Sequence, residues 1–172
     1  ISSIRRVLPK EVVLKVILES GSLAEPEKIA AASYLAMEAG ADFIKTSTGK
    51  QEPAATPQAA VVMCNCIKSY YKKSGRKVGF KPAGGISTTK DALTYYAIVE
   101  SILGKEWLNK DLFRIGASRL VNNLLTDIQG TTVKYFYQTL TPSTLLMRIL
   151  VTGANGQLGC SLMQRALETA AT

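Results

Sequence analysis

The sequence predicts an α/β protein in which short parallel strands alternate with helices. Short apolar runs recur between residues 12 and 116, and the first is nearly continuous, as expected for a parallel strand covered on both faces. Stretches with apolar residues at helical spacing separate these runs, and prolines and glycines stand where such helices would begin and end. This alternation favours a parallel sheet with helices packed against it.

Four strand–helix units follow one another, after residues 1–10, which are typical of the end of a helix. The strands are expected at residues 12–19, 41–44, 78–81 and 112–116. The helices are expected at residues 26–39, 56–74, 88–103 and 117–125. Pro26 suits the first turn of a helix that Gly40 would end in a left-handed conformation. Thr56 is a typical N-cap, and Pro57 would be the first helical residue.

Lys45 closes the second apolar run and is followed by Thr-Ser-Thr-Gly-Lys. In α/β proteins, ligands bind at the carboxyl ends of parallel strands. A lysine there has its stem desolvated by neighbouring strands, which lowers the pKa of its amine and makes it a nucleophile. A lone lysine in such a position more often simply reaches solvent.

Lys81 closes the third apolar run in the same way, before Pro-Ala-Gly-Gly, and lies 36 residues after Lys45. That spacing fits one strand–helix–strand unit, so the two amines could face each other across neighbouring strand ends. Each cation disfavours the charge of the other, so the pKa of one should fall well below its ordinary value. This arrangement suits a Schiff-base lysine beside an acid–base lysine.

Four segments carry a resemblance to a known family: Leu14–Gly21 (LKVILESG), Ile44–Lys50 (IKTSTGK), Phe80–Ile86 (FKPAGGI) and Phe113–Ser118 (FRIGAS). Over residues 1–130 the chain resembles deoxyribose-phosphate aldolases, which are class I aldolases on a TIM barrel. The resemblance implies a partial barrel whose four units match strands five to eight. It also implies that Lys45 is the Schiff-base nucleophile and that Lys81 perturbs its pKa and relays protons.

The resemblance leaves the amino-terminal half of the barrel unmatched, together with the family's acid–base aspartate. Asp42 stands at the start of its expected strand and Asp91 lies in an expected helix, so neither matches that residue. We therefore expect the isolated chain to turn over poorly. A half-barrel also has open strand edges, which predicts a homo-oligomer or pairing with a partner half-barrel. A non-catalytic half-barrel that needs such a partner is one alternative function.

Glycine-rich loops predict a phosphate site at the same strand ends. Gly84 and Gly85 precede one expected helix, Gly116 and Ser118 precede another, and helix amino termini favour anions. Turn glycines alone would explain the pattern equally well. The resemblance implies that these loops hold the 5-phosphate of deoxyribose. The other residues expected to contribute are Thr48, Gly49 and Lys50. The family usually has a second serine after Ser118, whereas this chain has Arg119.

The reaction implied by the resemblance is a lyase reaction of deoxyribonucleotide catabolism. It cleaves 2-deoxy-D-ribose 5-phosphate to D-glyceraldehyde 3-phosphate and acetaldehyde, and it needs no metal and no organic cofactor. The chain has no histidine, which excludes Ser-His-Asp triads and histidine metal ligands. Its net charge of +8 suits a phosphorylated ligand.

The pattern of basic residues and the cysteines bear on the partners and the cellular location. The basic residues show no interleaved aromatics, so we expect no nucleic-acid partner. Cys64, Cys66 and Cys160 form no paired framework, which fits a reduced compartment. No membrane span or signal peptide is visible, so we expect a cytoplasmic protein.

The carboxy-terminal segment differs from the rest. Residues 131–146 suggest a linker, and residues 147–172 suggest a single strand and helix. Gly153, Gly156 and Gly159 follow the short strand, as at the start of a dinucleotide-binding unit. The segment resembles the beginning of dTDP-4-dehydrorhamnose reductase, but the acidic residue and second strand of such a site are absent from the sequence. A fragment of an NAD(P)-dependent sugar-nucleotide reductase is therefore the other alternative.

Overall fold

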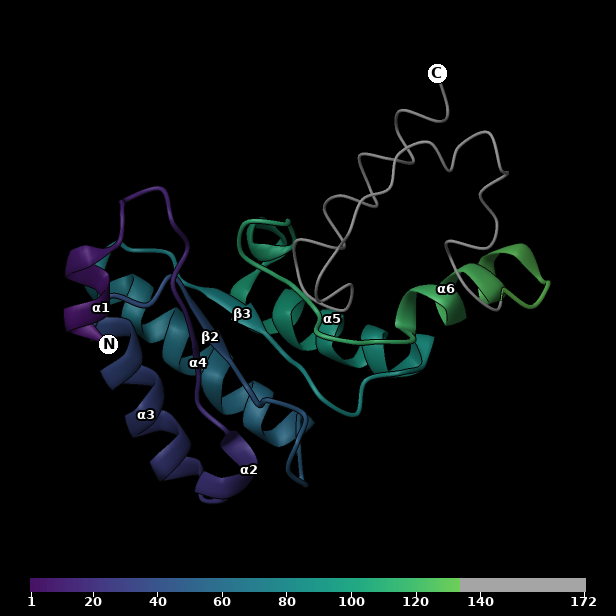
Figure 1. The fold of residues 1–172 in the computed structure, drawn as a ribbon, viewed down its shortest axis with the longest axis horizontal. Coiled ribbons are helices and arrows are strands. Elements are labelled where there is room, and N and C mark those ends of the chain that lie inside the picture. Colours follow the sequence, from purple (N-terminus) through teal and green to yellow (C-terminus); the bar gives the residue numbers. More distant parts are fainter. Residues whose placement is uncertain (134–172) are drawn as a thin grey trace.

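A three-stranded parallel sheet lies at the centre of residues 1–133, the part of the chain that this computed structural model describes (Figure 1). Its strands are β1 (Lys15–Ile17), β2 (Phe43–Lys45) and β3 (Gly79–Lys81), in that spatial order. Lys15 pairs with Phe43, which in turn pairs with Gly79. The predicted α/β class with a parallel sheet is therefore confirmed.

The helices of the described residues are Ser2–Val7 (α1), Ser20–Leu23 (α2), Pro26–Glu38 (α3), Pro57–Ser74 (α4), Thr89–Leu103 (α5) and Leu120–Gln129 (α6), with a 3-10 turn at Lys105–Trp107 (η1). Helices α3, α4 and α5 begin and end within one residue of where the sequence predicted. The Thr56 hydroxyl accepts a hydrogen bond from the Ala59 N–H at 3.1 Å, which confirms the N-cap of α4. Gly40 follows α3 with φ +96°, as its predicted role at the helix end requires.

The fourth predicted strand, at residues 112–116, does not form a ladder. It contacts β3 and the loop after it through two isolated bridges, Phe80 with Phe113 and Ala83 with Gly116. Phe80 both donates to Leu112 and accepts from Arg114, but the next donor on that edge would be residue 82. Residue 82 is proline, which has no N–H, so the ladder is interrupted. The prediction of four equivalent strands was wrong at this point.

Two other boundaries also differ from the prediction. The first strand is confined to Lys15–Ile17, and the short helix α2 follows it directly. Glu19 and Ala24, which flank α2, have positive φ angles that the sequence did not signal. The last helix begins at Leu120 rather than at residue 117 and continues to Gln129. The predicted tail at 147–172, and all of the predicted linker after residue 133, lie outside the described residues.

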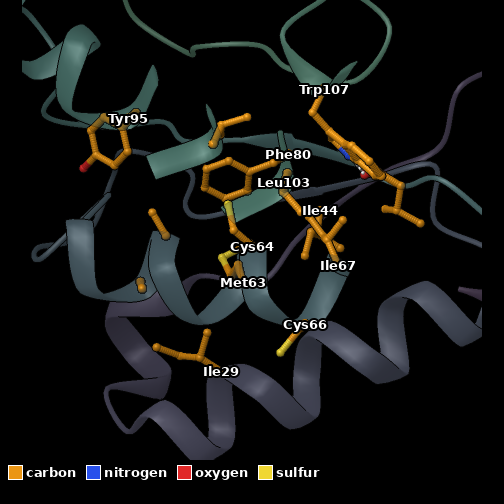
Figure 2. Close-up of a cluster of buried hydrophobic side chains, with 14 of the residues drawn as sticks. Ile29, Ile44, Met63, Cys64, Cys66, Ile67, Phe80, Tyr95, Leu103 and Trp107 are labelled. Atoms are coloured by element: carbon orange, nitrogen blue, oxygen red, sulfur yellow. Dashed lines mark hydrogen bonds between the residues drawn. The ribbon is translucent and has the colours of Figure 1, made fainter. Parts of the chain in front are cut away.

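One face of the sheet packs against α3, α4 and α5, and this contact forms the core. Ile44 and Phe80 point to this side and are fully buried. Figure 2 shows them among side chains of the three helices: Ile29, Met63, Cys64, Cys66, Ile67, Tyr95 and Leu103. The predicted role of Cys64 and Cys66 as core filling is confirmed, and burial raises the pKa of both thiols.

The opposite face of the sheet carries polar and charged side chains. Successive residues of a strand alternate between faces, and paired residues of parallel neighbours share a face. The register therefore places Lys15, Lys45 and Lys81 together on the side away from the helices. The two lysines predicted to be catalytic, Lys45 and Lys81, therefore lie on this second face.

Arg5 joins α1 to the amino end of the sheet. Its Nη1 atom lies 3.0 Å from Asp42 Oδ2, and the same carboxylate oxygen accepts from the Leu14 N–H at 2.8 Å. Arg5 also donates to the carbonyl oxygens of Leu8 and Pro9. Asp42 thus holds the end of the sheet that is remote from the predicted site, as its place in the sequence suggested.

Within residues 1–133, none of the helices combines the length and the apolarity needed to cross a membrane.

Trp107 offers a test of the core. Its ring is 2% exposed, and its Nε1–H donates to the Val78 carbonyl at 3.0 Å. We expect Trp107→Phe to lower the free energy of unfolding by about 2–4 kcal/mol, because it creates a cavity and leaves that carbonyl unpaired. Tyr96→Phe, at a side chain that is 43% exposed, is the matched control and should change it by less than about 0.5 kcal/mol. Urea denaturation measures both, and equal effects would contradict the described packing.

Candidate active site

Lys45 and Lys81 occupy matching positions on neighbouring strands. They are partners in the β2–β3 register, and each is the last residue of its strand. Both side chains therefore leave the same face of the sheet at its carboxyl end. Lys81 is only 5% exposed, whereas Lys45 is half-buried. The structure thus brings the two predicted lysines to one rim.

Gly116 makes room for the Lys81 side chain. A Cβ atom at Gly116 would lie 2.9 Å from Lys81 Cε and 2.6 Å from Ala83 Cβ, both closer than real Cβ contacts. From the sequence, Gly116 was expected in a phosphate-binding loop. The structure shows that its missing side chain also lets the lysine stem pass.

Lys15 is a third lysine on this face, and the sequence analysis gave it no function. It lies at the level of Phe43, one layer below Lys45. Burial, the guanidinium of Arg114 and the charge of Lys45, in that order, lower the pKa of Lys15, while a side-chain hydrogen bond with Lys81 acts in the opposite direction.

Arg114 closes the same face from the segment that bridges to β3. Its guanidinium carbon lies 4.3 Å from the centroid of the Phe43 ring, and its Nε donates to the Lys110 carbonyl at 2.7 Å. Nη1 is buried and makes no hydrogen bond within the described residues. Burial lowers the pKa of Arg114. Little in the sequence indicated that Lys15 and Arg114 would share this face. Lys15 stood out only because it interrupts the first apolar run, and Arg114 only as the arginine within FRIGAS.

Thr46 and Ser47 connect the ends of β2 and β3. The fully buried Thr46 hydroxyl accepts from the Ala83 N–H at 2.9 Å and contacts the Ala83 carbonyl oxygen at 3.1 Å. The Ser47 hydroxyl donates to the same carbonyl oxygen. These bonds hold the Thr-Ser-Thr-Gly-Lys loop against Pro-Ala-Gly-Gly, so two of the loop's three hydroxyls are structural.

The residues predicted to bind phosphate divide into two groups. Thr48, Gly49 and Lys50 are exposed, and a Cβ on Gly84 would lie 3.1 Å from Gly49 Cα, so the two loops touch. Gly85 is exposed beside Gly84, and both have positive φ. The bridge between Ala83 and Gly116 brings the second group, Gly116 and the exposed Ser118, to the neighbouring loop.

The two nearby helix amino termini differ in their capacity for an anion. At α5, the Thr88 hydroxyl and the Asp91 carboxylate form a capping box, and Asp91 also accepts from the Ser87 N–H. A carboxylate already occupies that end, which confirms that Asp91 lies in a helix and disfavours phosphate there. At α6, Arg119 is the N-cap without a side-chain cap bond, and the first turn has no acidic residue. The α6 end therefore favours an anion.

Glu19 is a further rim residue that the sequence analysis missed. It follows β1, and its carboxylate accepts from both the N–H and the hydroxyl of Thr48. LKVILESG contained this glutamate, but nothing in the sequence indicated that it would reach a loop 29 residues away.

Within residues 1–133, no group of three or more histidine, cysteine, aspartate or glutamate side chains is placed to hold a metal ion. Gly153, Gly156 and Gly159, predicted to resemble a nucleotide-binding loop, lie outside the described residues.

Comparisons with known proteins agree with this architecture. A model described as "DeoC/LacD family aldolase" matches residues 10–118. A Caenorhabditis elegans protein provisionally named deoxyribose-phosphate aldolase is 54% identical over 112 residues, covering 65% of this chain and 37% of that protein. The deoxyribose-phosphate aldolase of Mus musculus is 51% identical over 114 residues, covering 66% of this chain and 36% of that enzyme.

A solved structure shows the same likeness in three dimensions. The apo form of a Toxoplasma gondii protein, provisionally identified as a deoxyribose-phosphate aldolase, matches with a TM-score of 0.64 and 26% identity. The match covers 75% of this chain and 48% of that one. The chain thus spans a little over a third of the length of the curated relatives and about half of the solved one.

Lys15 provides a test of the electrostatics of this face. Its folded-state pKa is lowered, so between that value and the ordinary 10.5 the unfolded chain binds more protons than the folded chain. The amount by which the Lys15 charge lowers the free energy of unfolding should therefore shrink to nothing as the pH rises toward 10.5. We expect the stability advantage of Lys15→Met over the unaltered chain, measured by denaturation between pH 7 and 10.5, to decrease along this range.

Lys68→Met, at an exposed position of α4, is the matched control. The difference between its free energy of unfolding and that of the unaltered chain should stay constant over this pH range. A constant offset for Lys15→Met as well would show that Lys15 is not desolvated.

Proposed function

The chain belongs to the DeoC/LacD family of aldolases, and from this premise we propose that it is a Schiff-base lyase acting on 2-deoxy-D-ribose 5-phosphate. The products would be D-glyceraldehyde 3-phosphate and acetaldehyde. The observation that carries the proposal is the register of β2 and β3, which places Lys45 and Lys81 side by side at one rim.

We assign the nucleophile to Lys45 because it is the more accessible of the two. Lys45 is half-buried shortly before the exposed Thr48–Lys50 loop, whereas the Lys81 stem is enclosed beside Gly116. A nucleophile must reach its substrate, while a perturbing cation only needs to be near. Lys81, enclosed on the same face and paired with Lys45 in the register, suits the second role.

The proposed reaction starts with attack of the neutral Lys45 amine on the aldehyde carbon of the open-chain sugar. Loss of water from the carbinolamine gives an iminium ion, which accepts the electron pair of the C2–C3 bond when that bond breaks. The C3 hydroxyl loses its proton, and glyceraldehyde 3-phosphate departs. Protonation of the remaining enamine and hydrolysis release acetaldehyde and regenerate Lys45.

For the phosphate we propose the loops that contain Gly84, Gly85, Gly116 and Ser118, on the side nearer α6. The uncapped amino terminus of α6 supports this side, and the Asp91 carboxylate argues against the α5 end. Gly49 packs against Gly84, so the loop that carries Lys50 lies beside these glycines. Arg119, at the N-cap of α6, would add a positive charge where the family usually has serine.

Reductive trapping tests the nucleophile. Borohydride reduces an imine to a stable secondary amine, so acetaldehyde should add the mass of one ethyl group to the intact chain. We expect Lys45→Met to abolish this adduct. Lys81→Met should slow its formation by at least about tenfold, because a neighbouring cation that shifts a pKa by one unit changes the neutral fraction tenfold.

Lys68→Met controls for a general loss of surface lysines and should form the adduct at the original rate. Persistence of the adduct in Lys45→Met would overturn the assignment.

We also propose that the free edge of β1 pairs with another strand. Within the described sheet, β1 has a neighbour on one side only, and Ile17 at that edge is 42% exposed. Unpaired backbone groups and exposed apolar residues are typical of pairing edges. Light scattering should then give a mass above that of one chain, and Ile17→Lys should lower it. A monomer at high concentration would contradict this proposal.

A further inference from the structure

We propose that Glu19 is a positioning residue for phosphate recognition and acts through Thr48. This inference rests on the proposed function, because it concerns how the same rim distinguishes a phosphorylated aldehyde from an unphosphorylated one. The observations that carry it are the hydrogen bonds of Glu19 to Thr48 and the close packing of α2 against the residues that follow Lys50.

The Glu19 carboxylate determines how Thr48 is oriented. Oε2 accepts from the Thr48 hydroxyl at 2.6 Å, and the two carboxylate oxygens accept from the Thr48 N–H at 3.1 and 3.2 Å. An ionised carboxylate only accepts, so the Thr48 hydroxyl must donate to it. The hydroxyl oxygen is then free to accept from the Lys50 N–H, which lies 3.2 Å away. One carboxylate thus orients Thr48 directly and Lys50 through it.

Glu19 itself is held in an unusual conformation. Its φ and ψ are 54° and 58°, in the left-handed region that residues other than glycine rarely adopt. Such a conformation persists where the surroundings enforce it. Ser20 donates from its N–H to the Thr46 carbonyl at 2.8 Å, which anchors the residue that follows.

Helix α2 also packs directly on the loop that continues from Lys50. A Cβ on Gly21 would lie 1.8 Å from the Pro53 carbonyl oxygen, so only glycine permits this approach. The Ser22 hydroxyl donates to Gln51 Oε1 at 2.6 Å. The segment after β1 therefore contacts the loop at Thr48 through Glu19 and at Pro53 through Gly21. The ribbon in Figure 1 shows α2 beside this loop.

The hydrogen bonds also decide which donors of the loop remain for an anion. Thr48 N–H and hydroxyl are both used by Glu19, and the Lys50 N–H is used by Thr48. Within residues 1–133, the Gly49 N–H has no acceptor. We infer that Gly49 N–H and the Lys50 ammonium meet the phosphate, and that Thr48 contributes only through its position.

The negative charge of Glu19 would by itself repel phosphate. If repulsion dominated, Glu19→Gln would bind phosphate more tightly than the unaltered chain. If positioning dominates, both Glu19→Gln and Glu19→Ala bind it more weakly, because a neutral amide oxygen accepts the two Thr48 donors less strongly than a carboxylate and alanine does not accept them at all. We expect weaker phosphate binding by both variants, whereas repulsion would give tighter binding by Glu19→Gln.

The first measurement is a titration of the full chain with inorganic phosphate, followed by backbone amide NMR at Gly49 and Gly85. Losing one hydrogen bond of ordinary strength corresponds to about a fivefold to tenfold change in affinity, so we expect Glu19→Ala to weaken binding by about that factor. Glu27→Gln removes the same charge at an exposed site on α3 and should leave the affinity unchanged. Unchanged or tighter binding by Glu19→Ala, or no binding by the unaltered chain, would overturn the inference.

The second measurement separates positioning from general structural damage. In Glu19→Ala, borohydride trapping of acetaldehyde should keep its rate, whereas trapping of 2-deoxyribose 5-phosphate at subsaturating concentration should slow by a similar factor. Glu19→Asp, which retains a carboxylate, should recover part of the difference. Equal slowing of both substrates would assign Glu19 a merely structural role. If the unaltered chain forms no adduct with either, the proposed function fails, while the phosphate titration still decides the role of Glu19.

Discussion

The parallel register of β2 and β3 is the constraint on which the rest of the arrangement depends. Ile44 and Phe80 are fully buried against the helices, and their neighbours Lys45 and Lys81 leave the opposite face. Moving one strand by a single residue would turn its lysine into the apolar core and its apolar residue out. The burial of two uncharged side chains therefore sets the position of two charged ones, although the strands are only three residues long.

The sequence predicted features that local chemistry determines and missed those that depend on tertiary contacts. Thr56, Pro57 and Gly40 act within one or two turns of their own helices, so the bounds of α3 and α4 were predictable. The proline that interrupts the fourth strand was visible as a residue, but its effect depends on which neighbour needed the missing N–H. Likewise, the left-handed conformation of Glu19 follows from contacts with a distant loop.

The candidate site shows the same division within one motif. Thr-Ser-Thr-Gly-Lys suggested a set of ligand-binding hydroxyls, but Thr46 and Ser47 are committed to the Ala83 backbone. Only the third hydroxyl, at Thr48, is exposed, and it donates its hydrogen bond to Glu19. The three hydroxyls of the motif therefore form hydrogen bonds within the protein that hold the rim together. Lysine and backbone groups are left to contact a ligand.

The face of the sheet away from the helices gathers positive charge. Lys15, Lys45 and Lys81 share this face, and the Arg114 guanidinium lies over the Phe43 ring beside them. Burial first, and then the charges of Arg114 and Lys45, lower the pKa of Lys15. Neighbouring cations disfavour one another's charge, so this face is electrostatically costly to form. The strand pairing that builds the apolar core on one side of the sheet therefore also concentrates the cations on the other.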